Sequence, residues 1–117
     1  MSRSQQQYLQ DILEAMEAAE SFVEGTTFEE LKEDQRTQFA LQRAFEIIGE
    51  ATKQLDGSLR ERHSDIPWQE MAGMRDVLIH GYFAADLKII WDTIRERFPQ
   101  EKPRIRKILE ELAEAGK

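Results

Sequence analysis

The sequence predicts an all-α protein, an up-and-down bundle of about five helices that forms a single domain over residues 1–117. Apolar residues recur at i, i+3 and i+4 intervals through most of the chain, which is the spacing of one face of a helix. No stretch alternates strictly between apolar and polar residues, and no Asn-Gly turn joins two such stretches, so strands are not predicted. A length of 117 residues suits one domain with one hydrophobic core.

The first predicted helix spans residues 4–24 and ends at Gly25. Its other face is acidic. The apolar face is expected in the core and consists of Tyr8, Leu9, Ile12, Ala15, Met16, Ala19, Phe22 and Val23.

A second helix is predicted from Thr27 to Leu55, because Thr27 and Glu30 have the spacing of a capping box. Gly49 lies in its second half and permits a close approach by another helix. The expected core residues of that half are Phe39, Leu41, Ala44, Phe45, Ile47, Ile48, Ala51 and Leu55.

The middle of the chain is predicted to contain a turn at residues 56–58 and an irregular connector at residues 59–66. His63 is expected to be an exposed loop histidine. Pro67 fits the first turn of a central helix, where a missing amide is harmless.

Two helices are predicted at the end of the chain. Asp86 is expected to cap a helix over residues 87–98, which Pro99 stops. Pro103 then starts a final helix that ends near Gly116.

The composition excludes several classes of function. The chain has no cysteine, which rules out disulfides, iron–sulfur clusters and thiol catalysis and fits a reducing cytosol. No apolar run approaches the roughly 20 residues that cross a membrane, and the first residues lack an apolar signal region. The two histidines are 17 residues apart, and there is no Gly-rich phosphate loop or His-Glu-x-x-His motif. We therefore expect a cytoplasmic protein with no metal, no cofactor and no membrane segment.

The net charge of −7 is unevenly distributed. Residues 1–34 contain nine acidic and two basic residues, whereas residues 35–117 contain fourteen of each. Residues 95–107 carry a local charge of +4, from six cations against Glu96 and Glu101. This basic strip is either a solvated surface or a docking surface for RNA or an acidic partner. Its cations are Arg95, Arg97, Lys102, Arg104, Arg106 and Lys107.

Residues 73–83 combine an apolar run with four side chains capable of chemistry, Arg75, Asp76, His80 and Tyr82. Apolar neighbours at helical spacing indicate a largely buried helix, where charge is costly without a partner. These side chains are therefore expected either to pair with one another or to open onto a cleft. Asp76 and His80 are i, i+4 neighbours on one face, and Arg75 and Tyr82 line an adjacent stripe.

This set of side chains suits phosphate chemistry without a metal. An arginine binds phosphate oxygens through two donors, and a histidine titrates near neutral pH and can exchange a proton with a ribose hydroxyl. The Asp76 carboxylate can fix the tautomer of the His80 imidazole. The alternative is an ion-paired network of Arg75, Asp76 and His80 that only stabilises helix packing.

The spacing Arg75-x4-His80-x-Tyr82 resembles the R-x4-H-x-Y motif of HepT, the RNase toxin family of HepT–MntA toxin–antitoxin pairs within the α-helical HEPN superfamily. Three further segments resemble recurring family segments in the same order: AFEIIGEA at 44–51, DIPW at 65–68 and ADLKIIW at 85–91. The resemblance covers residues 5–115. Asp76 departs from it, because the family more often has Asn there, and a carboxylate competes for Arg75.

The resemblance implies a metal-independent endoribonuclease in which Arg75 binds the phosphate, His80 is the general base or acid and Asp76 supports it. It also implies a homodimer that brings two such sets into one cleft, and an MntA-like nucleotidyltransferase antitoxin that adds AMP to Tyr82. A different class of function stays open, a non-catalytic dimeric partner of a nucleotidyltransferase or a nucleotide-binding helical protein. Tyr82 is then an ordinary half-buried phenol.

Overall fold

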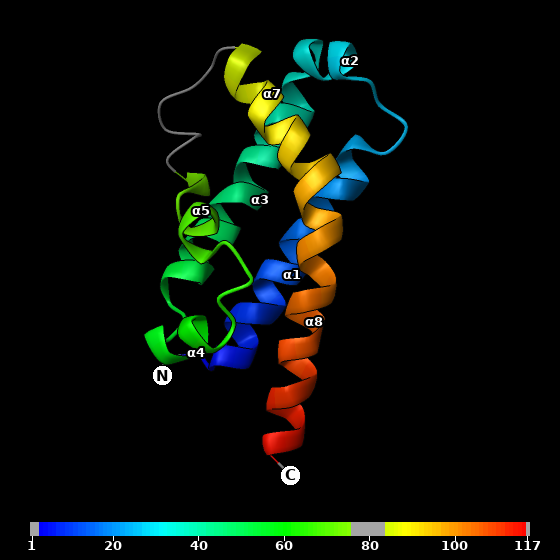
Figure 1. Cartoon of the computed structure of the whole chain (residues 1–117). Helices are drawn as coiled ribbons and strands as arrows, with labels where there is room; N and C mark the ends of the chain where they lie inside the picture. Colours follow the sequence, from blue (N-terminus) through cyan, green and yellow to red (C-terminus); the bar gives the residue numbers. More distant parts are fainter. Residues whose placement is uncertain (1–2, 76–83, 117) are drawn as a thin grey trace.

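The computed structural model describes residues 3–75 and 84–116, and within them every regular element is a helix (Figure 1). This confirms the predicted all-α fold class. The elements are α1 (Gln5–Val23), α2 (Phe28–Glu33), α3 (Gln35–Lys53), α4 (Gly57–Arg62), α5 (Trp68–Ala72), α7 (Ala84–Asp92), the π-helical turn η1 (Thr93–Arg97) and α8 (Phe98–Ala115).

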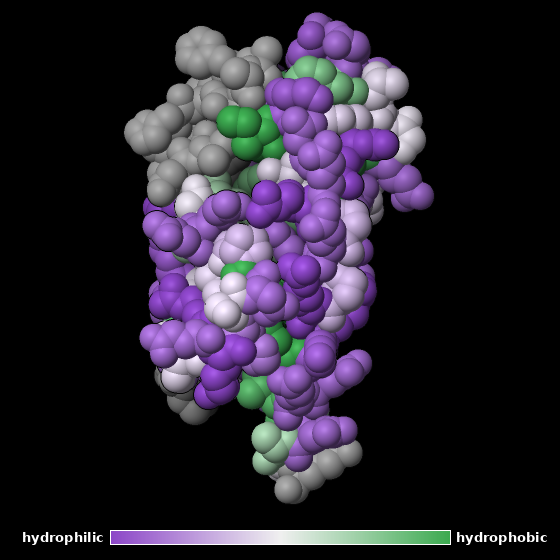
Figure 2. Space-filling view, viewed as in Figure 1, coloured by the Kyte–Doolittle hydropathy of each residue, from purple (hydrophilic) through white to green (hydrophobic). Residues whose placement is uncertain are grey.

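The core forms where the long helices meet. α1 packs against both α3 and α8, and α5 packs against α3. Fully buried side chains from these helices include Ile12, Phe45, Ile48, Phe98 and Ile105. The rings of Phe45 and Phe98 join α3 to α8, with their centres 5.8 Å apart. The face shown in Figure 2 is mostly hydrophilic, with hydrophobic colour in small areas between the helices.

Two aromatic residues expected in the core are at the surface. Phe22 is 42% exposed and Phe39 is 54% exposed. Phe39 shares a stripe of α3 with Arg43 and Glu50, at i+4 and i+11, and these are exposed as well. The stripe faces away from the core, which accounts for the exposure of Phe39. The prediction of a core position was wrong for both Phe22 and Phe39.

The ends of α1 agree with the sequence. The Ser4 hydroxyl accepts from the Gln7 amide at 3.1 Å, and the Gln7 side chain accepts from the Ser4 amide at 2.8 Å. Gly25 has a φ of 73°, the left-handed conformation that glycine adopts without strain. The predicted helix end at Gly25 is therefore confirmed.

Asp34 divides what was predicted as one helix from Thr27 to Leu55. The capping box is confirmed, because the Glu30 amide donates to the Thr27 hydroxyl at 3.1 Å and the Glu30 carboxylate accepts from the Thr27 amide at 3.3 Å. α2 then ends at Glu33, and the Asp34 carboxylate caps α3 by accepting from the Thr37 amide at 3.1 Å. The Thr37 hydroxyl donates to the same carboxylate at 2.6 Å and keeps the pKa of Asp34 below its usual value.

The predicted irregular connector is partly helical, since α4 occupies Gly57–Arg62. His63 is not an exposed loop residue either. Only 20% of its side chain is exposed, and Nε2 lies 3.7 Å from a Glu111 carboxylate oxygen of α8. Its carbonyl accepts from the Trp68 indole at 2.9 Å, which anchors the start of α5. Pro67 is the N-cap of α5, one residue before the predicted position.

The last two predicted helices are one helical run over residues 84–115 (Figure 1). Asp86 lies inside α7 and therefore does not cap it, and Pro99 and Pro103 lie inside α8. The π-helical turn η1 comes just before Pro99. In a regular α-helix the proline ring would clash with the carbonyl four residues earlier, and the wider π-helical repeat changes the backbone geometry at this point. The predicted end at Gly116 is confirmed, because this residue is the C-cap of α8.

Candidate functional site

Gly49 fixes the position of Arg75. α5 ends at Ala72, Gly73 is its C-cap, and Met74 and Arg75 are again helical. A Cβ built on Gly49 lies 3.1 Å from the Arg75 backbone nitrogen and 3.2 Å from the Ala72 carbonyl oxygen. A residue without a side chain lets α3 approach this segment closely. The predicted close approach at Gly49 is therefore confirmed.

The Arg75 side chain opens onto a groove. It is 45% exposed, and Nη1 lies 3.4 Å from Oε1 of Glu50 on α3. This is one of the two arrangements that the sequence allowed for it. The groove has a volume of about 500 Å³ and is lined by Tyr8, Asp11, Ile47, Glu50, Ala51, Lys53, Gln54 and Arg75.

Two antiparallel helices form the walls of this groove. The wall on α3 is one stripe at i, i+3, i+4 and i+7, formed by Ile47, Glu50 and Ala51 together with the C-cap residue Gln54. The start of α1 is held to the end of α3 by Gln5. Its side-chain amide donates to the Gln54 carbonyl at 3.3 Å and accepts from the amide of Asp56 at 2.7 Å.

Sequence reasoning missed the groove. The stripe on α3 was visible, but the register of α1 against it depends on the long-range contacts of Gln5, which no local pattern shows. Of the predicted catalytic group, the structure places Arg75 on this groove. Asp76, His80 and Tyr82 lie outside the described residues, and their roles stay predictions.

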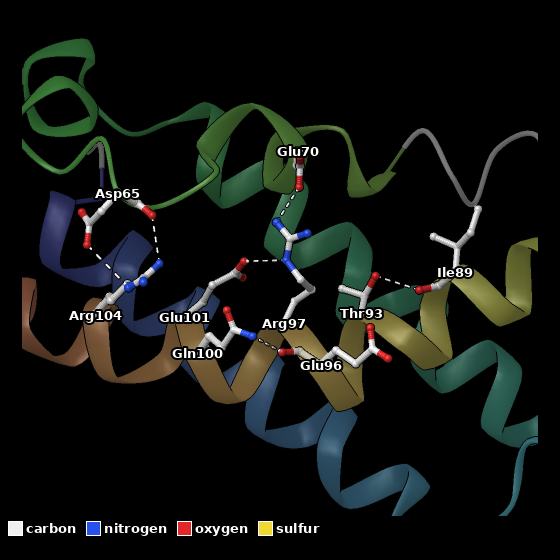
Figure 3. Close-up of polar contacts among 9 residues, drawn as sticks. All are labelled: Asp65, Glu70, Ile89, Thr93, Glu96, Arg97, Gln100, Glu101 and Arg104. Atoms are coloured by element: carbon white, nitrogen blue, oxygen red, sulfur yellow. Dashed lines mark hydrogen bonds and ion pairs between the residues drawn. The ribbon is translucent and has the colours of Figure 1, made fainter.

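The basic strip does not form one continuous surface. Arg97 and Arg104 lie on the side of α8 and η1 that faces α5 and the loop before it (Figure 3). Nη2 of Arg97 lies 2.7 Å from Oε2 of Glu70, and Nε of Arg104 lies 3.6 Å from Oδ2 of Asp65.

Other cations of the basic strip face α1. Lys102 pairs with Glu20, and Nη2 of Arg106 lies 3.7 Å from Oε2 of Glu17. The Arg95 guanidinium lies 5.1 Å from the centre of an indole ring of α7. Four of the six cations therefore have carboxylate partners within the chain. The docking role of the strip, including Lys107, stays a prediction.

Glu101 is a buried carboxylate that sequence reasoning treated only as part of the local charge. Its side chain is 3% exposed, and Oε1 lies 3.6 Å from Nε of Arg97 (Figure 3). Oε2 has no hydrogen-bond donor among the described residues. Burial raises the pKa of Glu101, against the opposing charge of Arg97. The i, i+4 spacing of Arg97 and Glu101 was the one available sign of this pair.

The all-α fold agrees with that of the HEPN-like class of helical proteins. Within that class, the model of the family described as Ribonuclease HepT-like matches residues 12–111, and the chain belongs to this family.

Relatives extend over nearly the whole chain. A Thermococcus cleftensis protein named probable ribonuclease HepT is 46% identical over 108 residues, which are 92% of this chain and 98% of the relative. A Caldanaerobacter subterraneus subsp. tengcongensis protein with a provisional RNase name is 44% identical over 103 residues, 88% of this chain and 92% of the relative. A Methanocaldococcus jannaschii protein with a similar provisional name is 37% identical over 105 residues, 90% and 87% of the two chains. No solved structure matches the chain significantly.

Residues 3–75 and 84–116 contain no helix with the length and apolar character that crossing a bilayer requires. The same ranges contain no group of three or more His, Cys, Asp or Glu side chains placed to hold a metal ion.

Proposed function

We propose that this protein is an endoribonuclease that cleaves RNA without a metal ion and acts as the toxin of a type VII toxin–antitoxin pair. Membership of the HepT-like ribonuclease family carries the proposal. Further support comes from Arg75, the first residue of the Arg75-x4-His80-x-Tyr82 pattern, whose side chain is exposed on a groove.

In the proposed reaction, the ribose 2′-oxygen attacks the neighbouring phosphorus and the bond to the 5′-oxygen breaks. His80 takes the proton of the 2′-hydroxyl or supplies one to the leaving 5′-oxygen. Arg75 binds the phosphate oxygens and stabilises the charge that develops on them. The products are a 2′,3′-cyclic phosphate and a 5′-hydroxyl.

One histidine does not easily perform both proton transfers at once. We therefore propose a homodimer in which two copies of Arg75 and His80 share a cleft. Asp76 orients His80 in each copy. Glu50 already pairs with Arg75 at 3.4 Å. Asp76, the next residue in the sequence, is a second carboxylate that can compete for the same cation.

Tyr82 is the proposed site of control. Its phenol oxygen attacks the α-phosphorus of ATP, pyrophosphate leaves, and the chain gains AMP through the action of a partner MntA-like nucleotidyltransferase. The added phosphate and its bulk then block RNA electrostatically and sterically. Tyr82→Phe should keep cleavage and lose AMP addition, measured by mass spectrometry after incubation with the partner and ATP. Loss of cleavage in this variant would contradict the assignment.

The principal test incubates purified protein with total RNA and with tRNA in EDTA. Wild type should produce 2′,3′-cyclic phosphate ends, and His80→Ala should be slower by roughly 10²–10⁴-fold. Arg75→Ala should also lose activity, whereas Arg36→Ala, which removes an exposed arginine from the start of α3, should not. Failure of dimeric, unmodified wild type to cleave would favour a non-catalytic partner of the nucleotidyltransferase.

A further inference from the structure

We propose that the groove between the start of α1 and the end of α3 binds the single-stranded RNA nucleotide next to the scissile phosphate. Tyr8 stacks on the base, and Lys53 contacts a backbone phosphate. The proposal rests on the proposed function in one respect, that Arg75 holds the phosphate that reacts. Nothing in the family match or in the names of the relatives assigns a role to Tyr8 or Lys53.

The groove is continuous with the surface around Arg75. Arg75, Tyr8 and Lys53 line the same groove, although they come from three different segments of the chain. Its volume of about 500 Å³ falls within the roughly 300–1,000 Å³ of sites for small organic ligands. The Gln5 contacts fix the relative position of the two walls, so the groove is formed before RNA arrives.

Tyr8 presents an aromatic ring to the groove. The ring packs against the core, yet it is only partly buried and lines the groove. The Arg3 guanidinium lies 6.0 Å from the ring centre and is held by the Asp11 carboxylate at 2.8 Å. An aromatic ring with a guanidinium over it, at the edge of a groove, combines the stacking and cation–π contacts that proteins use to bind unpaired bases of any sequence.

Most charged side chains around the groove are paired with one another. Each of its two carboxylates already has an arginine partner, Arg3 for Asp11 and Arg75 for Glu50. Lys53 has no carboxylate within 4.0 Å among the residues that the structure describes. The two cations that line the groove, Lys53 and Arg75, balance its two carboxylates, so the lining carries no net charge in a chain whose net charge is −7. The groove therefore repels a polyanion less than the acidic chain as a whole does.

The test measures binding separately from cleavage. The parent protein carries His80→Ala, and the probe is a nine-nucleotide RNA, fully 2′-O-methylated and therefore uncleavable, with 2-aminopurine at one position. Anisotropy gives the affinity at several salt concentrations, and quenching of 2-aminopurine reports stacking. The variants added to the parent are Tyr8→Leu, Tyr8→Phe, Lys53→Gln and Arg36→Gln.

Tyr8→Leu should weaken binding by roughly 5- to 150-fold and abolish quenching, whereas Tyr8→Phe should retain both. Lys53→Gln should reduce the slope of log affinity against log salt by about 0.7, the value for one phosphate contact on a single strand. Tyr8→Leu should leave that slope unchanged. Arg36→Gln is the matched control, because it removes a cation from the opposite end of α3, and it should change neither quantity.

The groove proposal would be overturned if Tyr8→Leu and Lys53→Gln bind RNA as well as the parent does. It would also be overturned if the parent does not bind RNA. If Tyr8→Leu does not fold, as judged by circular dichroism, the salt slope of Lys53→Gln decides, because that side chain is exposed. If wild type cleaves RNA but the groove variants bind RNA as well as the parent does, the groove proposal fails and the nuclease proposal stands. If RNA binding depends on Tyr8 and Lys53 but wild type does not cleave RNA, the groove proposal stands and the nuclease proposal fails.

Discussion

Gly49→Ala should separate stability from activity. The new methyl carbon lies 3.1 Å from the Arg75 nitrogen, 3.2 Å from the Ala72 oxygen and 3.2 Å from the Arg75 Cβ. All three atoms belong to the backbone or to the first side-chain carbon, so none can rotate away. Relief requires a shift of a few tenths of an ångström in the segment that carries Arg75.

Two opposing effects set the change in the free energy of unfolding. Replacing glycine by alanine inside a helix stabilises by about 1 kcal/mol. Overpacking costs about 1–3 kcal/mol. The net result is a loss of about 0–2 kcal/mol, which lowers the melting temperature by roughly 0–8 °C for a domain of this size.

Activity should fall further than this small loss of stability implies. A misplacement of about 1 Å in a catalytic group can cost about 10²-fold. A shift of a few tenths therefore predicts a loss of roughly 3- to 10-fold in kcat for RNA cleavage, measured where the variant is fully folded. The matched control is Gly57→Ala, because a Cβ there meets no atom within 4 Å. It should keep full activity.

A contradictory result is equally clear. The gain in helix propensity alone would raise the melting temperature by about 4 °C in a domain of this size. If Gly49→Ala shows this full rise and cleaves RNA at the wild-type rate, α3 does not constrain Arg75. The account of how the site is positioned would then be wrong.

Three further predictions concern other parts of the molecule. Phe98→Ala removes a fully buried ring that lies 5.8 Å from the ring of Phe45 and should cost about 3–5 kcal/mol in urea unfolding; a loss below about 1 kcal/mol would show that the core closes around the gap. Glu101 has a pKa raised by burial, so its contribution to stability is present below the unfolded-state pKa and is lost as pH rises through the folded-state pKa. Glu101→Gln should therefore raise the melting temperature near pH 7, with a gain that shrinks on acidification, and a gain independent of pH would contradict this. Glu50→Gln frees Arg75 from a half-exposed ion pair and should tighten RNA binding by roughly 1.4- to 5-fold, whereas weaker binding would show that Glu50 supports the site.

Local signals predicted much of the fold. The Thr27 capping box and the terminating Gly25 are confirmed because their chemistry lies within a few residues. Asp34 was missed because an aspartate within a polar stretch suits either a helix surface or a cap. Proline usually interrupts a helix, so Pro99 and Pro103 predict helix boundaries that the structure does not have. The π-turn that precedes Pro99 has no recognised sequence signature.

The site was predictable only in part. Gly49 could be identified as a point of close approach, and Arg75 was expected to open onto a cleft if it was not ion-paired in the interior. The groove and its Tyr8 wall depend on the register between α1 and α3, which is a long-range property. The burial of Glu101 likewise depends on how α8 packs against α5 and α3.

The pairing of α8 cations with carboxylates elsewhere in the chain has a consequence for kinetics. Because Lys102 and Arg106 are engaged by Glu20 and Glu17, they add little attraction at a distance. An approaching RNA therefore meets the field of a chain with a net charge of −7, and it experiences the groove only within about one Debye length, roughly 10 Å at 0.1 M salt. Added salt should thus raise the association rate constant while it lowers the final affinity, so that encounter and retention respond to ionic strength in opposite directions.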